Sequence, residues 1–178
     1  NWNVSNVVDF SEMFANTSSF NEDISGWDLS SGTNFEGFLY GCRNFNQDVS
    51  LWNISNATNI KNMLRTRSTD ISGNGVFNPN IVNFDISNVT SLSGFVAETN
   101  FNRNINTWNV SHITDMSELF SGCEDYNQPL NNWDTSNVIN MSSMFARNSV
   151  FNQDITGWNT SNVTNVSSMF VDATAFNQ

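Results

Sequence analysis

The apolar residues of this chain recur in one fixed order, and an aromatic residue marks each return. The returns are spaced 25, 25, 32, 24, 25 and 25 residues apart. Self-similarity with a period of about 20 to 50 residues is typical of stacked-repeat architectures. The sequence therefore predicts a single repeat domain over residues 1–178. Its units begin at Trp2, Trp27, Trp52, Phe84, Trp108, Trp133 and Trp158.

The apolar spacing changes within each unit. Trp108 and Val110 are two residues apart, as on one face of a β-strand. Met116, Leu119 and Phe120 follow the i, i+3, i+4 spacing of a single helical turn. This pattern predicts a right-handed, leucine-rich-repeat-like solenoid of about seven coils, each with one short β-strand and one short helical or 3₁₀ turn per ~25 residues.

Two polar positions of the repeat are as regular as the apolar ones. Asn makes up 33 of the 178 residues while Lys occurs once, so a structural demand for Asn explains its abundance better than codon usage. A buried Asn can bond backbone groups of its own coil and of the next one, because its amide offers two donors and an acceptor oxygen. We interpret the two positions as structural ladders; a carbohydrate- or ion-binding row is the alternative for the Asn position. The ladder residues are Asn21, Asn46, Asn78, Asn102, Asn127, Asn152 and Asn177, which follow an aromatic residue, and Ser5, Ser30, Ser55, Ser87, Ser111, Ser136 and Ser161.

Residues that could perform chemistry are few and scattered. Cys42 and Cys123 occupy the same repeat position three units apart, about 14 Å at ~4.8 Å per coil, which exceeds the ~7 Å Cα limit of a disulfide. We expect buried free thiols, with a disulfide to another chain or to a cysteine beyond these residues as the alternative. The single histidine, His112, cannot build a zinc site or a catalytic triad.

Acidic residues also recur, at Asp23, Asp48 and Asp154. One carboxylate per coil is more typical of solvated turns than of a Ca²⁺ site, which needs six to eight oxygen ligands. The sequence therefore predicts neither an enzyme nor a cofactor or metal site.

The third unit differs from the others by seven extra residues, which fall within 64–80. It carries three of the six basic residues. Insertions in repeat proteins form loops on one face, often the binding face, and a neutral insertion is the alternative. The candidate partner-binding residues are Lys61, Arg65, Arg67, Asp70 and Asn74.

The charge balance restricts the classes of partner. A net charge of −11, from 17 acidic and 6 basic residues, disfavours nucleic acids and anionic lipid surfaces. No apolar run approaches the ~20 residues that span a membrane, so direct membrane insertion of this segment is not expected. The sequence starts and stops within a repeat and lacks polar capping units, from which we expect an excerpt of a longer array.

One complete unit carries a specific resemblance. Residues 151–170 read Phe-Asn-Gln-Asp-Ile-Thr-Gly-Trp-Asn-Thr-Ser-Asn-Val-Thr-Asn-Val-Ser-Ser-Met-Phe. This pattern resembles the repeat of the BspA-like leucine-rich-repeat surface proteins, and variants of it cover essentially the whole chain. The resemblance implies an extracellular, surface-attached protein with a role in adhesion or in contacts with a host or matrix.

We therefore expect a non-enzymatic extracellular or cell-surface scaffold that binds a protein or glycan ligand. Self-association of copies into a fibre or surface layer is one alternative. Another is recognition of ice or a polysaccharide lattice through rows of Thr, Ser and Asn. The Thr row consists of Thr33, Thr58, Thr90, Thr114 and Thr164.

Overall fold

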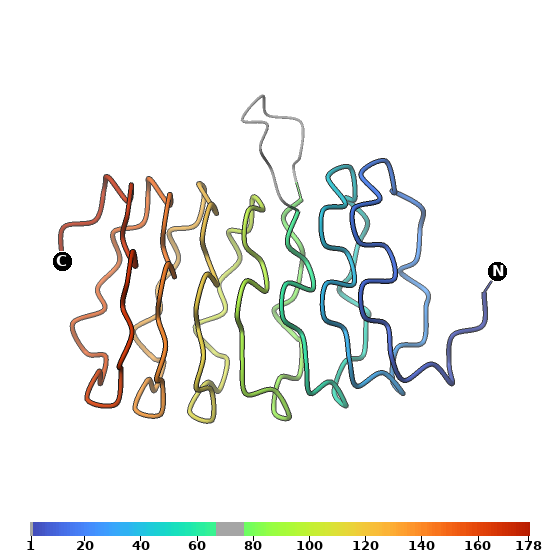
Figure 1. Ribbon diagram of the computed structural model, residues 1–178, viewed down its shortest axis with the longest axis horizontal. Helices are drawn as coiled ribbons and strands as arrows, with labels where there is room; N and C mark the ends of the chain where they lie inside the picture. Colours follow the sequence, from blue (N-terminus) through green and yellow to red (C-terminus); the bar gives the residue numbers. More distant parts are fainter. Residues whose placement is uncertain (1, 67–76) are drawn as a thin grey trace.

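The computed structural model describes residues 2–66 and 77–178, which wind into a rod of stacked coils. The coils follow one another along the longest axis, and the two termini lie at opposite ends (Figure 1). We number the coils one to seven by the unit starts given above. Within the described residues, strand-type bridges between neighbouring coils are limited to five isolated parallel ones: Asp9–Asn34, Asn34–Asn59, Ser91–Asp115, Asp115–Asn140 and Asn140–Asn165.

The predicted secondary structure is wrong. The described residues contain no helix, and their extended pairing does not go beyond these single bridges. The chain is therefore not the expected leucine-rich-repeat-like solenoid with a strand and a helical or 3₁₀ turn in each coil. Most of each coil consists of consecutive turns and irregular segments.

Left-handed residues prevent the expected helical turn. Two positions of the repeat, ten and fourteen residues after the leading aromatic, have φ between 53° and 74°. A right-handed helix needs negative φ at every residue, so the i, i+3, i+4 spacing arises here without one. The first position holds Glu12, Gly37, Asn62, Gly94, Glu118, Ser143 and Ser168, and the second holds Asn16, Gly41, Glu98, Gly122, Arg147 and Asp172.

The alternation of backbone conformation sends every second amide to the next coil. In coil one, Glu12 N donates to Glu36 O at 2.7 Å and Phe14 N donates to Phe38 O at 3.0 Å. The residue between them bonds locally, because Met13 N donates to Phe10 O at 3.2 Å. The same alternation recurs between coils five and six, so this segment satisfies its backbone without a helix or a sheet.

Asx turns restrict the strand to one bridge. The bridging residue Asp115 accepts the backbone N–H of Ser117 through Oδ1 at 3.0 Å, and Asn140 accepts that of Ser142 at 3.1 Å. A side chain that bonds the amide two residues ahead bends the chain away from an extended ladder. Extended pairing is therefore limited to a single bridging residue in each of these coils.

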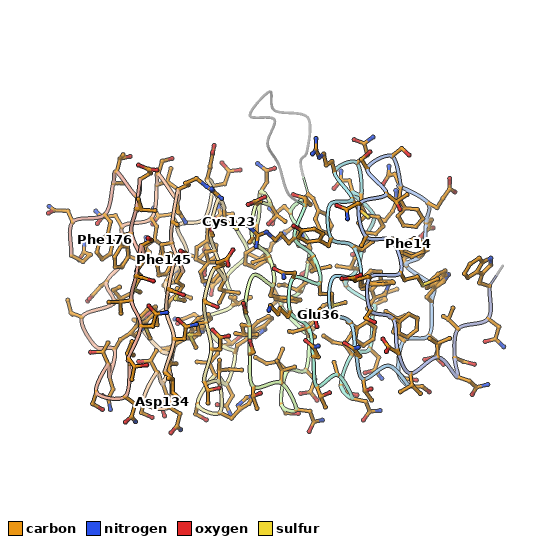
Figure 2. The ribbon with its side chains drawn as sticks, in the orientation of Figure 1. Phe14, Glu36, Cys123, Asp134, Phe145 and Phe176 are labelled. Atoms are coloured by element: carbon orange, nitrogen blue, oxygen red, sulfur yellow. The ribbon has the colours of Figure 1, made fainter. Side chains whose placement is uncertain are left out.

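Aromatic columns fill the interior of the rod. The Phe145 ring stacks on Phe120 and Phe170 of the neighbouring coils, with centroids 5.5 and 5.6 Å apart. Within its own coil it stacks on Phe151 at 4.0 Å. Figure 2 shows Phe145 inside the stack and Asp134 among the turns at its lower edge. Burial of these rings is the main apolar contribution to stability.

Buried tryptophans connect neighbouring coils through their indole N–H groups. Trp133 Nε1 donates to Ile105 O and Trp158 Nε1 donates to Leu130 O, each at 3.1 Å. Trp133 and Trp158 also stack with centroids 6.5 Å apart. Trp52 and Trp108 make the same bond, so in four of the coils the leading aromatic combines apolar burial with an inter-coil hydrogen bond.

Tyr126 occupies a position that holds Phe in the other coils, and its hydroxyl is buried without a hydrogen-bond partner in the described part of the chain. Burial raises the pKa of this phenol. We predict that Tyr126→Phe increases the free energy of unfolding by about 1 kcal/mol, because an unsatisfied buried hydroxyl is removed without a change of ring packing. Denaturant unfolding measures the effect, and Tyr40→Phe at a half-buried tyrosine is the control. A lower stability of Tyr126→Phe would contradict the assignment.

Asn148 is fully buried and satisfies three backbone groups. Its Nδ2 donates to Tyr126 O at 3.0 Å, and its Oδ1 accepts from Val150 N at 3.3 Å and Phe151 N at 3.0 Å. We predict that Asn148→Ala lowers the free energy of unfolding by about 3 kcal/mol, because these groups lose their partners inside the protein. The exposed neighbour variant Ser149→Ala should change it by less than about 0.5 kcal/mol. Equal effects of both variants in denaturant unfolding would count against the buried role.

Acid should destabilise the rod through the aspartates of its turns. Hydrogen bonds from Ser30 and Ser136 hold the pKa of Asp28 and Asp134 below 3.8, and those from Ser87 do so for Asp85. Their stabilisation is complete above the unfolded pKa and is lost as the pH falls through the lower folded pKa.

The triple variant Asp28→Asn, Asp85→Asn and Asp134→Asn tests this pH dependence. Asn keeps the acceptor oxygen and stands at the same position in coils one, three, five and seven. Urea midpoints measured between about pH 2 and pH 7 should fall less steeply in acid for the variant than for the parent chain. Identical acid profiles would show that the three carboxylates do not contribute.

Candidate ligand-binding groove

The structure describes two of the five candidate partner-binding residues of the third coil. Arg67, Asp70 and Asn74 lie outside the described residues, and Lys61 is exposed. Arg65 is largely covered, because its guanidinium pairs with Glu118 at 2.7 Å and with Glu98 at 2.9 Å. The expected partner-binding role of these five residues stays a prediction.

Arg65 belongs to a chain of ion pairs that crosses four coils. Glu98 bridges Arg65 and Arg147, which lies 3.1 Å away. The Thr66 hydroxyl also donates to the Glu98 backbone carbonyl. Because Arg65 and Glu98 are largely shielded from solvent, their pairing is screened less than an exposed one. This network ties the irregular third coil to coils four, five and six.

The Asn residues that follow the aromatics bond from coil to coil through their side-chain oxygens. Asn102 Oδ1 accepts from Asn127 N at 3.3 Å and from Gln128 Nε2 at 2.9 Å. Asn127 Oδ1 accepts from Asn152 N at 3.1 Å and from Gln153 Nε2 at 2.9 Å. The same backbone bond joins Asn21 to Asn46, Asn78 to Asn102 and Asn152 to Asn177. These side chains are exposed or half-buried, which differs from the buried position that we expected.

The Ser row marks a turn. Each of the seven serines donates its backbone N–H to the Asn or Asp side chain two residues earlier, at 3.0 to 3.2 Å. The carbonyls of Ser30, Ser55, Ser111 and Ser136 in turn accept from an Asn side chain of the next coil, as in Asn137 Nδ2 to Ser111 O at 2.8 Å. Sequence reasoning missed this second Asn, although it follows the Ser directly in most units.

A shallow groove of about 340 Å³ opens to solvent beside the Asn row. Three of its residues, Asn78, Asn102 and Asn127, belong to that row. The other three are Asn100, Asp125 and Val150, each of which directly precedes an aromatic residue. The groove thus lies between a constant position of the repeat and a variable one.

The groove presents hydrogen-bond donors, one carboxylate and one apolar side chain. In the described part of the chain, Nδ2 of Asn102 and of Asn127 donates to no protein acceptor, although Oδ1 of each is occupied. Asp125 Oδ2 accepts from Asn100 Nδ2 at 2.8 Å. Val150 is 39% exposed. This set of groups can bind a neutral polar ligand.

Sequence reasoning did not identify Asn100, Asp125 and Val150. Their position holds Ser19, Asn44, Val76, Asn100, Asp125, Val150 and Ala175 in successive units, while the next residue is always aromatic. A variable position directly before a constant aromatic residue was the available signal.

The two thiols are buried and free, and each donates to a carbonyl of the preceding coil. Burial raises the pKa of Cys42 to about 11 and that of Cys123 to about 12, so both remain protonated and unreactive at neutral pH. Figure 2 shows Cys123 within the rod.

Two further features are absent from residues 2–66 and 77–178. No group of three or more His, Cys, Asp or Glu side chains is placed to hold a metal ion. No helix there has the length and apolar character needed to cross a membrane.

Comparison with known proteins gives one match. No curated protein matches the chain. No solved structure matches it either. The family model described as "Mycoplasma protein of unknown function, DUF285" matches residues 1–72 and 92–178, which is most of the sequence. The chain therefore belongs to the DUF285 family.

Proposed function

We propose that this chain is a non-enzymatic repeat scaffold that is displayed outside the cell or on its surface and binds another macromolecule. The observation that carries this proposal is the open groove on a rod whose two thiols are buried. The repeated polar side chains bond one coil to the next. The side chains that do not take part in these bonds can contact a partner.

The rod suits an extended partner better than a small molecule. Its groove is shallow and draws residues from successive coils, whereas small-molecule sites bury most of the ligand in a concave pocket. Repeat proteins commonly bind through such extended surfaces. A protein segment or a glycan therefore fits the surface, and the acidic chain disfavours nucleic acid.

The resemblance of residues 151–170 to the BspA-like repeat supports surface display and a role in adhesion. That resemblance suggests a more specific role than membership of the DUF285 family does, because the description of the family gives no function.

Glycan binding is the second candidate, and the groove favours it more than the Thr row does. Thr58 Oγ1 donates to Thr33 O and Thr114 Oγ1 donates to Thr90 O, each at 3.2 Å, so the scaffold already uses these hydroxyl protons. Val8 and Ile139 also interrupt the row with exposed apolar side chains. The groove, in contrast, keeps donors for a ligand.

Surface display can be tested on cells that make the native full-length protein. We expect an antibody raised against this segment to label intact cells, because a scaffold for adhesion must be reachable from outside. An antibody against a cytosolic protein is the control and should label only permeabilised cells. Staining of this segment that also requires permeabilisation would contradict surface display. Sedimentation of the purified protein separates a monomeric binder from a self-associating fibre.

A further inference from the structure

We propose that the groove beside Asn102 and Asn127 binds an N-acetylated, uncharged glycan strand that runs along the rod. This inference rests on the proposed binding function and names the ligand class of one surface. It is carried by two amide donors that the scaffold leaves without an acceptor, together with the carboxylate and the valine next to them.

Within each of these Asn side chains, Oδ1 bonds to the next coil and Nδ2 is left as a donor for a ligand. Oδ1 of Asn102 is occupied by the Asn127 backbone and the Gln128 side chain. Oδ1 of Asn127 is likewise occupied by the Asn152 backbone and Gln153. These bonds fix the orientation of each amide, so the position of Nδ2 is set before any ligand arrives. Preorganised donors reduce the entropy that binding would otherwise cost.

The donors repeat once per coil. The aromatic residues that directly precede the Asn row have ring centroids 5.6 Å apart for Phe101 and Tyr126 and 6.2 Å apart for Tyr126 and Phe151. The Asn residues follow these aromatic residues directly in the chain, so each of these coils presents one Asn of the row. A ligand that presents one acceptor per similar step can contact successive coils.

The types of group in the groove indicate the ligand chemistry. An acetamido carbonyl accepts from an amide N–H, and a sugar hydroxyl donates to the Asp125 carboxylate. The exposed Val150 side chain offers an apolar contact for an acetamido methyl group or the C–H face of a sugar. A carboxylate in an acidic protein repels anionic glycans, which favours an uncharged strand.

A peptide strand matches these groups less well. Strand addition needs alternating donors and acceptors, but the Asn oxygens of the row are already occupied within the rod. Peptide N–H groups would therefore remain without partners.

The test compares N-acetylglucosamine hexamer with glucose hexamer by calorimetric titration of the 178-residue chain. We expect the acetylated oligomer to bind more tightly. Asn127→Asp should weaken its binding about tenfold or more, because Asp keeps the oxygen that the ladder needs and replaces the donor by an anionic acceptor. Asn46→Asp makes the same chemical change in coil two, away from the groove, and should alter affinity less than about twofold. Unfolding midpoints of both variants verify the fold.

Two other substitutions separate the contributions. Val150→Thr should reduce the preference for the acetylated oligomer over the glucose oligomer, because it replaces one methyl group by a hydroxyl at nearly constant volume. Joint replacement of Thr58, Thr90 and Thr114 by Tyr should leave binding unchanged.

Absence of binding by the acetylated oligomer would overturn the proposal, and so would equal affinity for the two oligomers. Equal effects of Asn127→Asp and Asn46→Asp, or a loss of binding on replacement of the Thr row, would overturn it too. Labelling of intact cells by the antibody is independent of all these outcomes. Surface display without glycan binding would reject this inference and leave the proposed function intact.

Discussion

The rod depends on backbone amides that bond alternately within a coil and to the next coil. This alternation requires left-handed residues at regular positions, and it holds whether the residue is Gly94 or Glu118. The left-handed conformation costs a non-glycine residue roughly 1–2 kcal/mol. The inter-coil hydrogen bonds must offset this cost at each left-handed position. The aromatic columns, the indole hydrogen bonds and the Asn row all repeat because this backbone register repeats.

The sequence made the period visible but concealed the local backbone. Residues that bridge neighbouring coils, such as Asp115 and Asn140, are 25 apart, which equals the common spacing of the leading aromatics. The spacing of Met116, Leu119 and Phe120 indicated a helical turn because it also describes which side chains point inward from a chain of tight turns. Apolar periodicity reports the direction of side chains and does not report the sign of φ.

The groove was hidden for a different reason. Repetition draws attention to constant residues, and the constant Asn and Ser of this chain bond to neighbouring coils or close turns. The variable residues that complete the groove, among them Asp125 and Val150, carry no pattern of their own. Only the fold shows that a constant Asn and the variable residue two positions before it border the same hollow. In a stacked repeat, residues at equivalent positions of successive units become neighbours in space. A surface is therefore composed of columns of residues from different coils rather than of continuous segments.

The scaffold also biases the hydrogen-bonding character of its own surface. Five Asn residues of the row, among them Asn102 and Asn127, accept a backbone amide of the next coil through their side-chain oxygen, because that amide needs an acceptor there. What remains on the outside is the N–H half of the amide. A partner that contacts this row must therefore bring acceptors, while the acidic side chains around it accept donors and repel anions. The chemistry of recognition on this face follows from the way in which the coils are held together.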